Sequence, residues 1–250
     1  MRNSLLKTII LVISSAGLIS CGNSLPALPD DPNNEPAAVD GGQVDLGSEI
    51  EPTVPAVPPV VSEEEPTLVS ERDEILKEYA YVDPKRIVPD RHLEEALIYF
   101  HKNKATLKNK NVLSVIDYSQ KSTQKRWYFI NMQTGAVWNI HVAHGKGSDS
   151  NHDGYAEKFS NISGSNATSL GFFRTAETYN GANGFSLRLD GLSSTNSKAR
   201  DRAIVVHGAS YVQDTSVIQG RSWGCPAVST ANTQKVINLI KGGSLIYAAK

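Results

Sequence analysis

Two residues that together support acyl transfer, His207 and Cys225, lie near the end of the chain. His207 follows the apolar run at 204–206, and Cys225 lies one loop later in the segment Gly-Arg-Ser-Trp-Gly-Cys-Pro-Ala at 220–227. An imidazole can remove the proton of a thiol, and the thiolate then attacks an acyl carbon. We therefore predict Cys225 as the nucleophile and His207 as its base.

The neighbours of these two residues can supply the other parts of such a site. A main-chain carbonyl such as that of Gly208 can orient the imidazole. Gly224 lets the backbone approach a substrate closely, so the N–H groups of Gly224 and Cys225 can face the oxyanion of a tetrahedral intermediate. Pro226 favours extended geometry at Cys225, which fixes how the thiol is presented.

This block resembles the L,D-transpeptidases of bacterial cell walls, in the branch called murein L,D-transpeptidase catalytic domain. The family motif is a His followed, after a loop, by Ser/Thr-His-Gly-Cys, and the matching positions here are His207 and 222–225. The resemblance extends over most of 110–250, including 144–148 and 170–173. In two respects the sequence departs from the pattern: Trp223 replaces the second motif His, and Pro-Ala at 226–227 stands where most members have Asn.

The resemblance implies a reaction. Cys225 would attack the carbonyl between the L-centre of meso-diaminopimelate and the terminal D-alanine of a peptidoglycan tetrapeptide stem, releasing D-alanine and leaving a thioester. An amine of a second stem would resolve the thioester as a crosslink. Water would instead give a tripeptide, the L,D-carboxypeptidase reaction. A non-catalytic lipoprotein that binds the wall is the alternative outside enzymology. Neither a metal nor a cofactor is implied.

Further substrate contacts are expected around the catalytic loop. Trp223 is the aromatic expected to line the cleft, and the resemblance places the loop that follows residue 143 beside the active site. The substrate-binding candidates are Ser222, Trp223, Arg221, His144, Lys146 and His152.

The sequence does not favour a calcium site or a zinc site. Residues 149–154 match the start of a calcium-binding loop, but Ser160 occupies the position where a bidentate Glu is needed. We expect an Asx-turn loop there. His141 and His144 are three residues apart, and in extended chain such positions point to opposite faces, which makes them a poor zinc chelate.

Other cysteine enzymes fit the sequence less well. Papain-like proteases and wall endopeptidases place Cys before His in the chain. Sortases place His first, but with a wider spacing and a later Arg.

The N-terminus predicts export and lipidation. Arg2 and Lys7 flank the start of a short apolar run, followed by small residues and Leu-Ile-Ser-Cys at 18–21, which resembles a lipobox. We expect a lipoprotein signal peptide at 1–20 and a lipid on Cys21. The chain has two Cys, so Cys225 would be left without an intramolecular disulfide partner. The expected location is the cell envelope, anchored in the outer membrane and facing the periplasm, as a monomer.

Composition then divides the chain. Eleven acidic residues and no Lys or Arg lie between Gly22 and Glu71, with nine of the twelve prolines. We predict a disordered tether at 21–70, a helical lead-in at 71–108 and a catalytic domain at 109–250. Residues 72–250 carry a net charge near +8, which suits an anionic polymer. The sequence contains no recognised nucleic-acid motif, so we expect no nucleic-acid partner.

Periodicity predicts a mainly β fold (β-rich α+β), a mixed sheet or sandwich with short helices on the N-terminal side and near the C-terminus. Helices are expected at 71–81 and 90–104, the second with Asp90 as N-cap, and after Ser229. A long loop is expected at 145–171. The expected strands are 112–118, 126–131, 136–143, 186–189, 203–208 and 245–248.

Overall fold

The computed structural model of the chain describes residues 65–250. The predicted signal peptide at 1–20, the predicted lipidation site Cys21 and most of the predicted tether lie outside the described residues. Within the described part, no helix is both long and apolar enough to span a bilayer.

The described chain forms one mixed sheet with three α-helices and one 3₁₀ turn. The helical elements are α1 (Glu65–Glu78), α2 (Asp90–Asn103), η1 (Ser194–Asn196) and α3 (Thr230–Ile240). The strands are β1 (Val112–Asp117), β2 (Trp127–Asn131), β3 (Val137–Ile140), β4 (Gly171–Gly181), β5 (Gly184–Gly191), β6 (Val205–Ala209), β7 (Ala227–Ser229) and β8 (Leu245–Ala249). The predicted mainly β class, with short helices on the N-terminal side and near the C-terminus, is confirmed.

The eight strands lie in the order β3-β2-β1-β8-β4-β5-β6-β7. Pairing is parallel between β1 and β8 and between β6 and β7, and antiparallel elsewhere. An isolated bridge joins Ala143, just past β3, to Ala227 of β7. Because β3 and β7 are the two ends of the strand order, this bridge nearly closes the sheet on itself.

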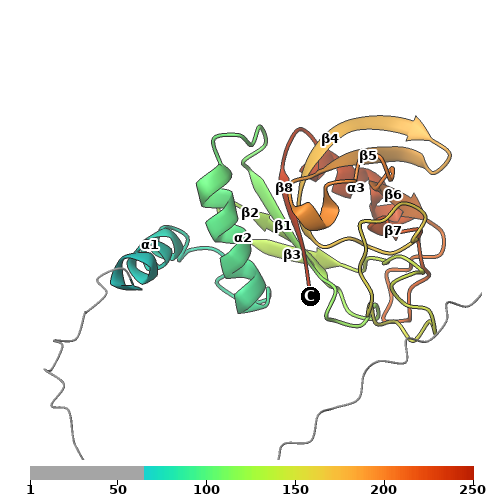
Figure 1. Ribbon diagram of the computed structural model, residues 1–250, viewed down its shortest axis with the longest axis horizontal. Helices are drawn as coiled ribbons and strands as arrows, with labels where there is room; N and C mark the ends of the chain where they lie inside the picture. The colour runs from blue at the N-terminus through green and yellow to red at the C-terminus, as the bar shows by residue number, and fades with distance from the viewer. Residues whose placement is uncertain (1–64) are drawn as a thin grey trace, which may run out of the picture. The chain divides into compact units, whose positions relative to one another are not determined.

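Both faces of the central strand β1 are covered. Leu113 and Val115 pack with α1 and α2, whereas Val112 and Ile116 belong to the core that includes α3. Successive side chains of a strand point to opposite faces, so burial on both sides explains why this strand is a continuous apolar run. In Figure 1, α2 lies beside the β1–β2–β8 part of the sheet and α3 beside the β5–β7 part.

The N-terminal helices differ slightly from the predictions. The helix α1 begins at Glu65, inside the segment predicted as tether, and ends at Glu78. A proline in the first helical turn, here Pro66, is tolerated because its missing N–H has no intrahelical partner there. The N-cap of α2 is Pro89, and Asp90 is the first helical residue, where its charge still favours the helix dipole.

Two strands were not predicted. The longest strand, β4, is not predicted from the sequence because few of its residues are apolar. It forms a hairpin with β5 whose distal part is exposed, and its register shifts between Thr175 and Thr178. The other strand is β7, which has three residues and pairs in parallel with β6. The predicted cap of α3 is confirmed, since the Ser229 side chain accepts the Asn232 N–H.

Candidate active site

His207 is buried in β6 and is held by its neighbour. Its Nδ1 donates to the Gly208 carbonyl oxygen at 3.0 Å, the contact predicted for Gly208. This tautomer leaves the lone pair on Nε2. Burial lowers the pKa of His207 below its ordinary value, and the Gly208 carbonyl offsets part of that effect. The imidazole is therefore neutral at pH 7 and can accept a proton at Nε2.

Cys225 reaches the same place through the pairing of β6 with β7. Ala227 is the register partner of His207, and Cys225 precedes Ala227 by two residues. The thiol is half-buried and donates to the Ala203 carbonyl oxygen with a sulfur–oxygen distance of 3.7 Å. No hydrogen bond joins the thiol to His207 among the described contacts. The strand register therefore places Cys225 two residues before the partner of His207, with the thiol turned towards Ala203.

The charge state of the thiol follows from its surroundings. Burial raises the pKa of the Cys225 thiol, and the Val205 backbone and the Arg202 guanidinium lower it only in part. At neutral pH the thiol is therefore protonated. A protonated thiol needs a neutral imidazole to accept its proton before it can act as a nucleophile.

A tight turn presents Cys225. The buried Ser222 donates its Oγ–H to the Cys225 carbonyl oxygen at 2.7 Å and accepts the Gly224 N–H at 3.1 Å. Ser222 therefore shapes the turn and is not exposed to a substrate. The predicted oxyanion role of the Gly224 N–H needs revision, because that donor is already occupied. The Cys225 N–H makes no hydrogen bond within the described residues and stays the candidate donor.

Gly224 is required by its backbone and its neighbours. Its φ is +118°, and an added Cβ would lie 2.7 Å from the Ala167 carbonyl oxygen and 3.2 Å from Nη2 of Arg202. The turn at 222–225 is thus packed directly against the loop at 160–169.

The long loop after β3 supports this turn. Ser222 donates its N–H to the His144 carbonyl at 2.9 Å, and the Lys146 N–H donates to the Ser222 carbonyl at 2.8 Å. Gly147 donates to the Asn166 carbonyl at 2.9 Å. The segment at 144–147 is therefore hydrogen-bonded both to the turn at 222–225 and to the 160–169 loop. Figure 1 shows these yellow loops next to the loops that precede β7.

The His144 side chain is only 1% exposed and has no free ring nitrogen. Nη2 of Arg126 donates to its Nδ1 at 2.7 Å, and its Nε2 donates to Asp149 at 3.0 Å. Burial, reinforced by the Arg126 charge, lowers the pKa of His144 to about 4. This imidazole is enclosed and neutral, so it does not face a substrate as expected and instead positions the loop.

Asp149 organises the turn that follows. It accepts the N–H groups of Asp153 and Gly154 at 3.1 Å each, which is the predicted Asx-type turn. Among the described residues, no three His, Cys, Asp or Glu side chains are grouped to hold a metal. Arg221 donates to the Asp149 carbonyl, and His152 contacts the Gln219 carbonyl at 3.1 Å. These two substrate-binding candidates therefore connect loops.

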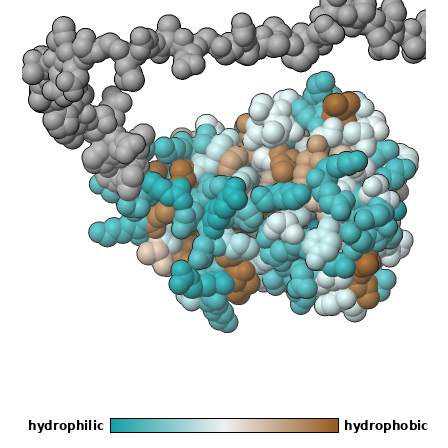
Figure 2. Space-filling view, turned by 60° about the horizontal axis from the view of Figure 1, so that its bottom comes forward, coloured by the Kyte–Doolittle hydropathy of each residue, from teal (hydrophilic) through white to brown (hydrophobic). Residues whose placement is uncertain are grey.

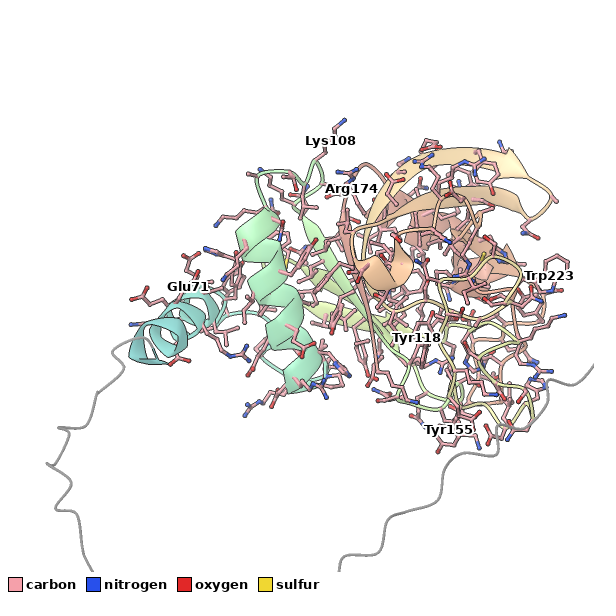
Figure 3. All side chains as sticks on the ribbon, viewed as in Figure 1. Glu71, Lys108, Tyr118, Tyr155, Arg174 and Trp223 are labelled. Carbon is pink, nitrogen blue, oxygen red and sulfur yellow. The ribbon has the colours of Figure 1, made fainter. Side chains whose placement is uncertain are left out.

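Lys146 and Trp223 are the candidates left on the surface. Trp223 is 73% exposed, and Figure 3 shows its indole projecting from the edge of the molecule. The Lys146 ammonium lies 5.7 Å from the centre of that indole. Both side chains can meet a ligand.

Two arginines at the site were not among the predicted site residues. Arg126 is fully buried and donates to the carbonyls of Val142 and Gln120 as well as to His144. Its position directly before the four apolar residues at 127–130 is the sequence feature that could have indicated a buried arginine. Arg202 lies beside Gly224, and only the fold brings it there.

The structure combines an eight-stranded, nearly closed sheet with a buried, neutral imidazole bound to a main-chain carbonyl and a half-buried thiol on the segment that precedes the paired strand. The family model described as L,D-transpeptidase catalytic domain matches residues 85–249. The chain belongs to this family. The match begins within the predicted helical lead-in and includes α2. No curated protein matches the chain.

Solved structures of L,D-transpeptidases are similar at low identity. The enzyme from Mycobacterium smegmatis is 18% identical, over 56% of this chain and 59% of that one, with a TM-score of 0.35. Mycobacterium tuberculosis L,D-transpeptidase 1 is 13% identical, over 56% of this chain and 62% of that one, with a TM-score of 0.32. The enzyme from Xylanimonas cellulosilytica is 16% identical, over 55% of this chain and 60% of that one, with a TM-score of 0.33. The chain thus spans less than two thirds of each of these structures, and the family assignment rests on the family model.

Proposed function

We propose that this protein is a peptidoglycan L,D-transpeptidase that transfers the acyl group of a stem peptide through a thioester on Cys225. The observation that carries the proposal is the His207–Gly208 hydrogen bond in β6, with Cys225 on the adjoining turn. This hydrogen bond holds the neutral imidazole of His207 in one tautomer, so that Nε2 can act as a base. Cys225 is the one cysteine among the described residues. Membership in the L,D-transpeptidase catalytic domain family supports the substrate class.

The first half-reaction would follow from this geometry. The thiol rotates from Ala203 towards His207, whose Nε2 takes its proton as the sulfur attacks the carbonyl between diaminopimelate and D-alanine. The Cys225 N–H would donate to the oxyanion. When the intermediate collapses, the C–N bond breaks, and D-alanine leaves with the proton returned by His207. The acyl group remains as a thioester on Cys225.

The second half-reaction sets the product. An amine of a second stem loses its proton to His207 and attacks the thioester, which gives a diaminopimelate–diaminopimelate crosslink and restores the thiol. Water as acceptor would give the tripeptide instead. Lys146 and Trp223 stand exposed beside the turn and would meet one of the two stems.

The experiment is incubation of the purified chain and its Cys225→Ala variant with tetrapeptide muropeptides, with products read by mass spectrometry. Loss of D-alanine with linked dimers, absent from the variant, supports the transpeptidase. Tripeptide monomers alone would make the protein an L,D-carboxypeptidase. Absence of any Cys225-dependent product or acyl adduct would favour the non-catalytic wall-binding lipoprotein.

The predicted location completes the proposal. A lipid on Cys21 would hold the protein in the outer membrane, and the predicted tether would let a monomeric catalytic domain reach the wall from the periplasmic side. The surface suits an aqueous, charged surrounding, since hydrophilic side chains predominate on the face in Figure 2. Labelling with radioactive palmitate, compared between the parent chain and Cys21→Ala, tests the anchor.

A further inference from the structure

A cavity opens beside the turn at 222–225. Its volume is about 500 Å³, and it is lined by Lys146, Ser163, Gly164, Asn166, Asp201, Arg202 and Trp223. This size suits a ligand of amino-acid dimensions. The cavity adjoins Cys225 because Trp223 and Gly224 directly precede the nucleophile and Arg202 packs on Gly224.

One cation of the cavity is already committed to the protein. Arg202 donates from Nη1 to the Ser160 carbonyl and from Nη2 to the Ala167 carbonyl, both at 2.6 Å. Two further contacts run to hydroxyls, Nη1 to Ser169 at 3.4 Å and Nη2 to Ser165 at 3.3 Å. Its guanidinium therefore fastens the 160–169 loop and forms a wall of the cavity.

The other two charges are uncommitted. Lys146 and Asp201 are exposed, and neither forms an ion pair within the described residues. The Lys146 ammonium rests over the Trp223 indole at 5.7 Å. The cavity thus offers one free cation, one free anion and one exposed aromatic face.

We propose that this cavity binds the free amino-acid end of a diaminopimelate side chain, in which an ammonium and a carboxylate share one carbon. Lys146 pairs with the carboxylate, Asp201 with the ammonium, and Trp223 covers the aliphatic chain between that end and the peptide. The inference rests on the proposed function and names the group that the site selects. A stem with lysine at this position presents the amine alone and leaves Lys146 unpaired.

Binding is measured apart from catalysis. The full-length chain with Cys225→Ala is titrated calorimetrically with L-Ala-γ-D-Glu-meso-diaminopimelate. The controls are the same peptide with the side-chain carboxylate amidated, and the same peptide with L-lysine in the third position. We expect Kd to rise about tenfold for either control peptide, and about tenfold for Lys146→Met or Asp201→Asn with the parent peptide. Lys158→Met removes an exposed lysine outside the cavity and should leave Kd unchanged.

Equal affinity for the diaminopimelate and lysine peptides would overturn the assignment. Unchanged Kd in Lys146→Met and Asp201→Asn, or no binding of the parent peptide at millimolar concentration, would overturn it too. Selective binding combined with absence of turnover by the Cys225 chain would retain the pocket and reject the proposed acyl transfer. The two proposals therefore fail separately.

The donor and the acceptor stem both carry this end group, and turnover distinguishes them. With an active Cys225, a pocket for the donor predicts slower D-alanine release in both variants. A pocket for the acceptor predicts unchanged release with fewer dimers and more tripeptide. Release and dimer yield both equal to the parent would contradict the proposal.

Discussion

His144 donates from Nε2 to Asp149 across 3.0 Å in an environment where both side chains are essentially buried. Arg126 donates to the other ring nitrogen at 2.7 Å. The three side chains hold the loop after β3 in one conformation, and the backbone of His144 and Lys146 passes that conformation on to Ser222. The turn at 222–225 is therefore supported by a network of buried side chains.

Acid should weaken this network. The pKa of His144 is lowered from 6.5 to about 4 in the folded chain, so the unfolded state binds more protons between these values. The stability from the neutral imidazole is thus complete above pH 6.5 and is lost as the pH falls towards 4. The loss should be on the order of 3 kcal/mol. Denaturant unfolding at several pH values measures it, and His144→Gln should flatten the decline; an identical slope in both proteins would contradict this origin.

Removing the Arg126 charge should destabilise the fold strongly. Arg126→Met leaves the Val142 and Gln120 carbonyls without their donor and Asp149 without a nearby cation, at a cost of about 3–5 kcal/mol. Arg188 is the matched control, since it forms a partly exposed ion pair with Glu177 at 3.2 Å. Arg188→Met should cost less than about 1 kcal/mol. Equal costs in urea unfolding would refute a structural role for the buried guanidinium.

Gly224 should not accept a side chain. In Gly224→Ala the Cβ would clash with the Ala167 carbonyl at 2.7 Å, so the turn must shift. A shift of this order should lower D-alanine release at least about a hundredfold. Gly184 also has positive φ, +72°, but nothing within 4 Å of a Cβ. Gly184→Ala carries backbone strain alone and should keep activity; loss in both variants would assign the effect to strain.

The pH profile of kcat/KM should report His207. Burial lowers its pKa, and a general base acts only when unprotonated, so the acidic limb should have its midpoint below pH 6.5. Activity therefore persists under mildly acidic conditions and is lost only as the pH falls through the folded-state value. D-alanine release from pH 4 to 8 provides the profile. A midpoint at or above 6.5, or a His207→Gln variant with parent activity, would argue against His207 as the base.

The parts of the candidate site that are local in the chain could be predicted from the sequence. His207 with Gly208, the turn at 222–225 and the cap at Ser229 are contacts between near neighbours, so residue type and spacing suffice to predict them. The strands β1 and β2 could also be predicted, because a strand that is buried on both faces is a continuous run of apolar residues. β4 could not, since an exposed hairpin carries too few apolar residues to reveal its pairing.

Which charged groups stay unpaired depends on contacts between distant segments of the chain. Lys146, His144, Arg202 and Asp201 look alike in sequence as polar residues near a motif. Their roles separate because contacts distant in the chain enclose His144 between Arg126 and Asp149 and commit Arg202 to the 160–169 loop. Residue types and spacing were enough to predict the mainly β class, which the structure confirms, and to propose Cys225 and His207 as nucleophile and base. The fold determined which charges remain for a ligand, since burial and long-range hydrogen bonding depend on how distant segments pack.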